Sequence, residues 1–301
     1  MRADQLVKEL LSDGPYHRPV APFQMLEVKG PDAADFLHRL CSQDVAGLPP
    51  GALRPAAFLD AKGKLLATCL LFRTGESVWL EVQQEQAERL AALLERYHFT
   101  EKLTITRLAG VRVAEWVHDL ELTNRAGFPD GPYLAYRRRG ISFVRVAANY
   151  SMDIDGVAVV PKPLADERAE CLRMLAGFLR VGVETEPATL ALEADLDDHI
   201  STTKGCYTGQ EIVARIHTYG HTNRKACLLL LAPGAPFATP QALHEPEDQL
   251  AVGRVLHAIA IPGREERLGV GYLPKDFQAL GTKLALTDGA AVEVIGYEPL
   301  R

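Results

Sequence analysis

The order of apolar and polar residues predicts an N-terminal region of short strands interrupted by a few helices. Apolar residues alternate with polar ones in many short segments, as they do in half-buried strands, and turn residues separate these segments. Strands are expected at 25–28, 58–59, 65–72, 78–82, 103–108, 111–116, 133–136 and 141–146. Helical spacing appears instead in 84–97 and 164–179, and in a shorter stretch after Gly30-Pro31.

The pattern changes near Thr222. Beyond this residue the helical spacing stops, and short apolar segments alternate with Gly and Pro. These segments are 227–231, 252–256, 268–272, 283–286 and 291–295. Such spacing predicts a separate all-β barrel or sandwich at the C-terminal end.

Charge and hydropathy narrow the possible partners. The chain has 33 basic and 39 acidic residues, a formal net charge of -6, which argues against direct nucleic-acid binding through a broad basic surface. A small anionic ligand remains possible. No apolar run approaches the roughly 20 residues of a membrane span, and charges interrupt the N-terminus too often for a signal peptide. A cytoplasmic protein without a membrane partner is expected. The run 137–140, Arg-Arg-Arg-Gly, is expected to be a solvated turn rather than a binding patch.

The cysteines indicate reduced thiols rather than a disulfide framework. Their number is odd, and no two of them form a Cys-x-x-Cys pair. They are Cys41, Cys69, Cys171, Cys206 and Cys227. This spacing offers no ready set of ligands for zinc or an iron–sulfur cluster, so we expect no resident metal.

One loop combines several features of a ligand site. Residues 204–211 read Lys-Gly-Cys-Tyr-Thr-Gly-Gln-Glu. Thr208 and Glu211 have the spacing of a capping box, which predicts that a short helix starts here. Gly205 and Gly209 would let the backbone approach a ligand closely. A helix N-terminus and Lys204 would add positive charge, which lowers the pKa of a nearby thiol and makes Cys206 a candidate nucleophile.

Each of these residues also has a purely structural interpretation. A lone cysteine beside an apolar helix can be a small buried hydrophobe, and Cys206 fits either interpretation equally well. Gln210 and Glu211 can be first-turn helix residues or hydrogen-bond partners of a polar heterocycle. Arg215 can pair with Glu211 on the helix surface or meet a ligand carboxylate.

Two aspartates could also contribute to a site at this loop. Asp44 and Asp60 are expected to be capping or turn residues, and they matter for a site only if the fold brings them to the 204–211 loop.

The loop and several other segments resemble one family. Residues 204–211, with Arg215 after them, closely resemble the signature of the YgfZ-type folate-binding proteins, which are relatives of the glycine-cleavage T-protein, an aminomethyltransferase. The similarity extends to 30–38, 43–45, 59–64, 190–196, 252–255 and 268–273, so that it covers nearly the whole chain.

The resemblance implies an α+β fold, a three-domain cloverleaf of the T-protein type, with two α+β domains and a C-terminal β-barrel around a central folate-binding hole. It implies a discontinuous first domain, 1–50 and 147–221, that carries the cysteine loop, a second domain at 51–146 and a barrel at 222–301. It implies tetrahydrofolate, or a one-carbon-substituted form, as the cofactor. The folate-binding residues that it suggests are Lys204, Gly205, Tyr207, Gly209, Gln210, Glu211, Arg215, Asp44, Asp60 and Glu193, with Cys206 as the catalytic residue.

The chain departs from the family pattern in two places. Aminomethyltransferases carry a catalytic Asp in an Asn-rich stretch after a strand, whereas the corresponding residues 82–86 here are Val-Gln-Gln-Glu-Gln. Glu85 could substitute for that Asp but is better interpreted as a first-turn helix acid. The stretch 180–189 is short, and Glu184, Glu186 and Glu193 all compete to be the acid that faces the pterin. Arg215, Arg224 and Arg254 are candidates to bind the glutamate tail of the folate.

Three functions follow from the resemblance. The first is a tetrahydrofolate-binding accessory protein that supports assembly or repair of iron–sulfur clusters, and thereby tRNA-modifying enzymes, with Cys206 as the functional thiol. Its partners would be folate and iron–sulfur enzymes or cluster carriers. The second is a folate-dependent aminomethyltransferase or methyltransferase, against which the missing Asp argues. The third is a folate sensor or scaffold without chemistry.

Overall fold

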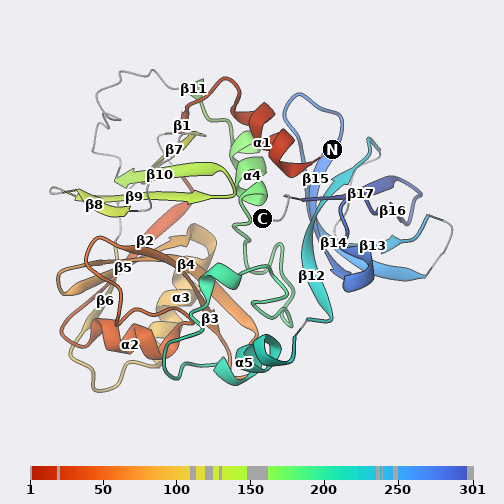
Figure 1. Ribbon diagram of the computed structural model, residues 1–301. Coiled ribbons are helices and arrows are strands. Elements are labelled where there is room, and N and C mark those ends of the chain that lie inside the picture. The colour runs from red at the N-terminus through yellow and green to blue at the C-terminus, as the bar shows by residue number, and fades with distance from the viewer. Residues whose placement is uncertain are drawn as a thin grey trace.

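The described strands of the molecule form two open sheets and one closed barrel. The computed structural model of the chain describes residues 2–18, 21–108, 113–118, 125–128, 131–147, 162–220, 222–234, 238, 240–246 and 250–296. Figure 1 shows the barrel at one side of the molecule and the two open sheets at the other, with helix α4 (Asp166–Leu175) between them.

The first open sheet has five strands, and every neighbouring pair is antiparallel. In spatial order they are β3 (Leu53–Leu59), β4 (Leu65–Thr74), β5 (Ser77–Gln83), β2 (Phe23–Lys29) and β6 (Thr104–Arg107). Helices α2 (Ala33–Leu40) and α3 (Gln84–Arg96) bury Phe36, Leu37, Leu90 and Leu94 in the same core. Each such side chain contributes about 1.5–3 kcal/mol of burial, so this core holds both helices in place.

The second open sheet combines one strand that precedes the first sheet in the sequence with five strands that follow it. Its order is β11 (Lys162–Pro163), β1 (Tyr16–Arg18), β7 (Val113–His118), β10 (Ile141–Ala147), β9 (Gly131–Arg138) and β8 (Arg125–Phe128). Helix α1 (Ala3–Leu11) buries Leu6 and Leu10 in the core cluster that also contains Leu172 and Leu175 of α4. The helix expected at 164–179 ends at Leu175, because Gly177 takes a left-handed conformation with φ 75°.

The barrel closes with six strands around its own apolar interior. Around the barrel they are β12 (Arg224–Leu231), β15 (Arg267–Pro274), β14 (Ala251–Ala260), β13 (Gln241–His244), β16 (Lys283–Leu286) and β17 (Ala291–Ile295). Leu229, Leu243 and Leu273 are completely buried in it. The predicted C-terminal barrel is confirmed.

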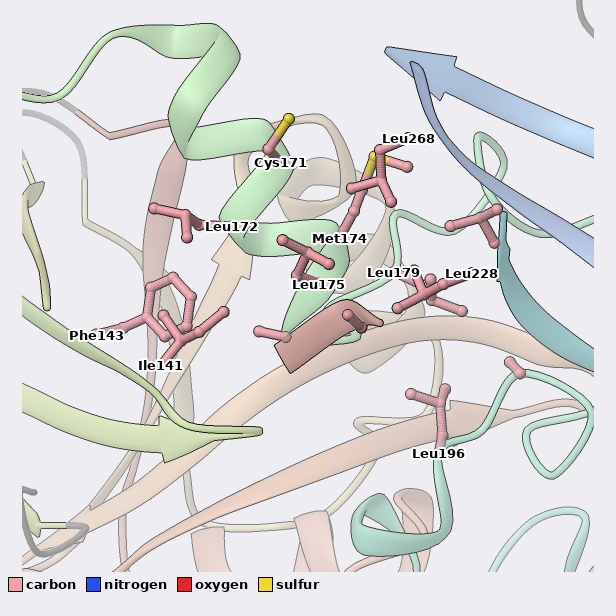
Figure 2. Close-up of a cluster of buried hydrophobic side chains, with 14 of the residues drawn as sticks. Ile141, Phe143, Cys171, Leu172, Met174, Leu175, Leu179, Leu196, Leu228 and Leu268 are labelled. Atoms are coloured by element: carbon pink, nitrogen blue, oxygen red, sulfur yellow. The ribbon is translucent and has the colours of Figure 1, made fainter. Parts of the chain in front are cut away.

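A shared core joins the barrel to the rest of the molecule. Leu175 of α4 and Leu179 just after it belong to one cluster with Leu196 and with Leu228 and Leu268 from the barrel. Figure 2 shows these side chains converging between α4, the barrel strands and the segment that carries Leu196. The barrel is therefore packed onto the other sheets rather than joined only by the chain.

The α+β class with a closed C-terminal barrel is thus established, while the boundaries predicted at 50, 147 and 222 remain predictions. Strand pairing alone groups β2 with β3–β6 across residue 50. No helix among the described residues is long and apolar enough to cross a membrane.

The arginines of the 137–140 turn are not simply solvated. The side chain of Arg138 is only 9% exposed and donates to Asp198 Oδ1 over 2.9 Å. It also donates to the backbone carbonyls of Gly177 and Asp195. The expectation of a solvated turn was wrong for Arg138, because loop carbonyls buried beside the β9–β10 hairpin require donors, and this guanidinium provides them.

Candidate functional site

Lys204 ties the cysteine loop to the end of α2. Its ammonium donates to the carbonyl oxygens of His38, Cys41 (2.8 Å) and Gln43 (3.1 Å). The last carbonyls of a helix lack intrahelical partners, and a cation there is favoured by the helix dipole. An ammonium has three N–H donors, so these contacts use all of them. Burial lowers the pKa of Lys204, against the raising effects of Cys41 and Asp44.

The other side of the loop is pressed against the β3–β4 hairpin. Gly209 has φ 84°, and a Cβ there would lie 2.6 Å from the carbonyl oxygen of Asp60 and 3.0 Å from the Cβ of Leu59. Tyr207 is 8% exposed and belongs to the core cluster around α4, and the ammonium of Lys204 lies 4.8 Å from the centre of its ring. The close approach that Gly209 permits is therefore to the hairpin.

Helix α5 (Gln210–Tyr219) begins where the sequence predicts a helix, but its cap differs from the prediction. Gly209 is the N-cap, and no side chain caps the helix. The capping box of Thr208 and Glu211 was therefore wrong, because the hairpin contact requires a left-handed glycine at the position that a capping side chain would occupy.

Cys206 is the exposed cysteine of the chain. Cys41, Cys69 and Cys171 are buried and Cys227 is half-buried. Burial raises the pKa of all four, for Cys171 and Cys227 to about 12, which keeps these thiols protonated and unreactive. The interpretation of Cys206 as a buried hydrophobe was wrong. An ideal Cβ on Gly205, the residue before it, would have no atom within 4 Å apart from its chain neighbours, so the loop is open at this position.

Asp44 and Asp60 are turn residues that the fold also brings to the loop. Asp60 Oδ1 accepts the backbone N–H groups of Lys62 (2.8 Å) and Lys64 (2.9 Å). Asp44 Oδ1 accepts the N–H of Gly47 over 2.9 Å and lies 3.2 Å from His38 Nδ1. Both therefore shape the two surfaces on which the loop rests.

Further along α5, Arg215 and Glu211 form the surface pair that was one of the two alternatives. Their side chains are 61% and 84% exposed, and Arg215 Nη2 lies 3.2 Å from Glu211 Oε1. Gln210 is the first residue of the helix.

The three competing acids lie in different environments. Glu184 is fully buried and pairs with Arg173 over 2.7 Å and with Arg180 over 3.4 Å. Glu186 bridges two barrel arginines, 2.7 Å from Arg224 and 2.8 Å from Arg254.

Glu193 lies near the same barrel strand. Its Oε2 is 3.4 Å from Arg224 Nε and accepts the N–H of Leu190 over 3.2 Å. Arg224 and Arg254, the candidates for a folate tail, therefore already have carboxylate partners, and a ligand carboxylate would have to compete with Glu186.

Two small cavities lie at the end of β5, where the family's catalytic Asp would be expected. They have volumes of about 30 and 20 Å³ and share Phe23 and Gln83 in their walls. The first is also lined by Glu81 and His199, the second by Glu85, Glu170 and Arg180 among others. None of the residues predicted for the folate site lines either cavity.

In the sequence, Gln83 is recognisable only as part of a stretch that departs from the aminomethyltransferase pattern. The polar residues around it come from distant segments, and most of them are buried. Buried polar residues in strands and loops are uncommon, but burial could not be read from the sequence.

Comparisons with known proteins agree with this fold. Residues 19–123 match the family model of the GCVT N-terminal domain. The glycine cleavage system aminomethyltransferase T of Bartonella henselae has the same fold, with a TM-score of 0.70 and 18% identity over 96% of this chain and 88% of that one.

Sequence relatives point to a narrower group. The chain is 25% identical to a putative chloroplastic transferase of Arabidopsis thaliana over 88% of this chain and 66% of the relative. It is 30% identical to a mitochondrial iron-sulfur cluster assembly factor, an IBA57 homologue of Phaeosphaeria nodorum, over 74% and 58%. It is 26% identical to the tRNA-modifying protein YgfZ of Serratia proteamaculans, over 75% and 73%.

The first two of these matches span less than two thirds of the relatives' own length. The domain match, the relatives and the fold nevertheless indicate the same family as the motif at 204–211. Together these findings support a YgfZ-type relative of the glycine-cleavage T-protein family.

Proposed function

We propose that this protein supports the assembly or repair of iron–sulfur clusters, including those of tRNA-modifying enzymes, and that Cys206 is its functional thiol. The observation that carries the proposal is the placement of Cys206, an exposed thiol on a loop fixed by Lys204 on one side and Gly209 on the other. A fixed, accessible thiol can attack an electrophilic sulfur or carbon, or ligate iron transiently. The names of the IBA57 and YgfZ relatives support the same role.

The thiol is tested by complementation. In bacterial cells that lack their own YgfZ protein, Cys206→Ala is expected to lose most of the activity that the wild-type chain restores to an iron–sulfur tRNA-modifying enzyme. Cys227→Ala, which removes a half-buried thiol, is the matched control and should retain it. Full complementation by Cys206→Ala would remove the thiol from the mechanism and leave the sensor or scaffold alternative.

The proposed cofactor is a reduced folate bound between the two open sheets. A pterin ring presents donors and acceptors along one edge, and Gln83, Glu81 and His199 offer complementary groups from one wall. Arg180 lies in the wall of the neighbouring cavity, and its buried Nε has no hydrogen-bond partner, which fits a missing acceptor there. When bound, the folate would supply ring nitrogens that carry one-carbon units.

Entry of the pterin requires the side chains at the shared wall to move. A cavity of 20–30 Å³ has room for about one water molecule. Phe23 and Gln83 separate the two cavities, so displacement of these two side chains would join them. Calorimetric titration with folinic acid tests binding. We expect heat release in the wild type and at least tenfold weaker binding in Gln83→Leu, and no heat at high micromolar ligand would reject the cofactor.

An aminomethyltransferase activity is the second candidate, because Glu85 lies in the wall of the second cavity. Glu85 is in the first turn of α3, two residues after Gln83, and could replace the absent Asp as a proton carrier. Turnover of an aminomethyl-lipoyl carrier with tetrahydrofolate, abolished in Glu85→Gln and retained in Glu88→Gln, would establish this activity. Absence of turnover in the wild type would exclude it.

A further inference from the structure

A third cavity, about 340 Å³ in volume, lies where α4 meets the barrel. We call it the barrel cavity. Its floor is apolar, with Met174 and Leu179 on the side of α4 and Leu228, Val270 and Ile295 on the side of the barrel. Figure 2 shows Leu179 and Leu228 near each other between α4 and the barrel, with Met174 extending towards Leu268. The volume is in the range of small-molecule sites, and an apolar wall with a few polar groups is their usual composition.

Among the described residues, the charged side chains in the wall of the barrel cavity are Arg139, Lys225 and Asp195, and together they carry a net positive charge. Lys225 Nζ lies 2.7 Å from Asp195 Oδ1, and Arg139 donates to Asp195 Oδ2. The carboxylate of Asp195 is thus shared by two cations. The exposed side chain of Asp197 lies further from Lys225, at 3.7 Å, and is not part of the wall.

Lys225 stays charged in this setting. Burial lowers the pKa of Lys225, but the hydrogen bond and charge of Asp195 outweigh burial and raise it overall. The thiol of Cys227, also in the wall, has its pKa raised to about 12, first by burial and then by Asp195, so it is a neutral part of the wall. The described part of the cavity therefore combines an apolar floor with a fixed positive charge.

A hairpin turn and a glycine place Arg139 at this cavity. Arg139 (φ 50°) and Gly140 (φ 80°) form the two-residue turn between β9 and β10, where positive φ at both positions is usual. Asp195 is also left-handed, with φ 58°, a conformation that Asp adopts more readily than most residues. A Cβ on Gly177 would lie 2.7 Å from Arg139 Nη1, so the glycine leaves room for the guanidinium.

We propose that the barrel cavity binds a small organic acid with an apolar body, such as an aromatic carboxylate. The apolar body would occupy the floor between α4 and β12, and the carboxylate would share Arg139 and Lys225 with Asp195. A planar guanidinium and an ammonium are the groups that bind carboxylates best in proteins. This cavity and the proposed folate site are neighbours, because Leu179 lines both the barrel cavity and the first small cavity, but Gln83 and Arg180 line only the small cavities.

The proposal is tested with 2-naphthoate as the carboxylate and 2-naphthamide as its neutral counterpart, titrated into the full chain by calorimetry. Naphthoate is expected to bind at least tenfold more tightly than naphthamide. No detectable binding of naphthoate at millimolar concentration, or equal binding of the two compounds, would overturn the proposal. This comparison needs no variant, so it remains decisive if a variant fails to fold.

Two lysine variants test the cation. Lys225→Met should weaken naphthoate binding about tenfold, because a hydrogen bond to a charged group is lost. Lys283→Met is the matched control, since Lys283 is also a barrel lysine paired with one carboxylate, Glu293 over 2.6 Å, but lies outside the cavity wall. Unchanged binding in Lys225→Met, or an equal loss in Lys283→Met, would contradict the assignment.

The methyl signal of Met174 locates the ligand, because Met174 lies in the cavity wall. In protein labelled with methyl-13C methionine, saturating naphthoate should shift the NMR signal of Met174, while the signal of Met25, which lies outside the wall, stays unchanged. Binding that leaves the Met174 signal unchanged would place the ligand elsewhere and reject this site.

Discussion

The cysteine loop differs from the polar centre at the end of β5, by which we mean the polar residues that line the two small cavities around Gln83, in how its residues are arranged in the sequence. The loop at 204–211 carries the most specific motif of the chain, yet most of its residues hold the loop in place: Lys204 ties it to α2, Tyr207 enters the core and Gly209 packs on the hairpin. The centre has no contiguous motif, yet it gathers buried polar residues from distant segments, among them Glu81, Gln83 and His199. A motif can thus encode the presentation of one thiol, while residues that could recognise a ligand are scattered.

The largest effect is expected beside the polar centre, from Glu184→Gln. This change removes a fully buried charge that pairs with Arg173 and Arg180, while Glu170 still pairs with both over 2.9 and 3.4 Å. We therefore expect a loss of about 3 kcal/mol in the free energy of unfolding, at the low end for a broken buried ion pair. Urea denaturation measures it, with Glu211→Gln, which breaks the exposed pair with Arg215, as the control that should lose less than about 0.5 kcal/mol. Similar losses in both variants would mean that the buried ion pairs of Glu184 contribute no more to the free energy of unfolding than an exposed surface pair.

In the loop, Gly209→Ala is expected to cost about 3 kcal/mol. The added Cβ would clash with the carbonyl of Asp60, and φ 84° is unfavourable for alanine. Gly205→Ala is the matched control within the same motif, because a Cβ there would contact nothing within 4 Å. It should cost less than about 1 kcal/mol. If Gly205→Ala were the more damaging of the two, the loop would not be anchored at the hairpin.

Lys204→Met should destabilise the protein by about 2 kcal/mol and loosen the loop. The carbonyls of His38, Cys41 and Gln43 lose a charged donor, and hydrogen bonds to charged groups contribute about 1.5–3 kcal/mol. Thermal unfolding gives the stability, and hydrogen exchange should show faster exchange in 204–211. Unchanged exchange there would show that the loop keeps its conformation without this tether.

A smaller, pH-dependent effect is expected from His199 in the centre. Its pKa is lowered by burial, against the raising effect of Asp198. A histidine whose pKa is lower in the folded state binds fewer protons than in the unfolded state, so stability falls as the pH falls from about 6.5 towards the folded pKa.

Denaturation at pH 7.5 and 5.5 measures this effect. His199→Gln should reduce the loss of stability between the two values by up to about 1 kcal/mol. The exposed His217→Gln should leave the loss as it is in the wild type. An unchanged pH dependence in His199→Gln would mean that this imidazole does not titrate with folding.

The smallest effect on stability is expected at Cys206, in the middle of the 204–211 motif. Cys206→Ser changes an exposed side chain, so the free energy of unfolding should stay within about 0.5 kcal/mol of the wild type. Circular dichroism during urea titration checks this. A loss above 1 kcal/mol would mean that Cys206 stabilises the loop, and the contrast between anchoring residues and the presented thiol would fail.

Local patterns predicted many of the elements, and long-range contacts decided the roles of the side chains. The barrel strands other than β13 and the hairpin at Asp60 follow from turn residues and apolar spacing, whereas β13 and α1 were not predicted. The start of α5 was predicted from a capping box that the structure does not have. The sequence could not reveal that Arg138 serves carbonyls near residues 177 and 195, because that contact depends on how the β9–β10 hairpin packs. That Lys204 faces the end of α2 rather than a ligand could not be predicted either, because its partner Cys41 is 163 residues away in the chain.

The contact between Lys204 and Cys41 also determines when the thiol becomes usable. These residues are 163 positions apart in the chain, so closing this contact restricts a long loop, and the contact as seen requires the end of α2 to be formed. During synthesis, α2 emerges from the ribosome long before the cysteine loop does. The thiol would then be displayed in its final geometry only on a chain in which the end of α2 is already formed. A chain that lacks this contact would instead carry the thiol on a loop without its tether to α2.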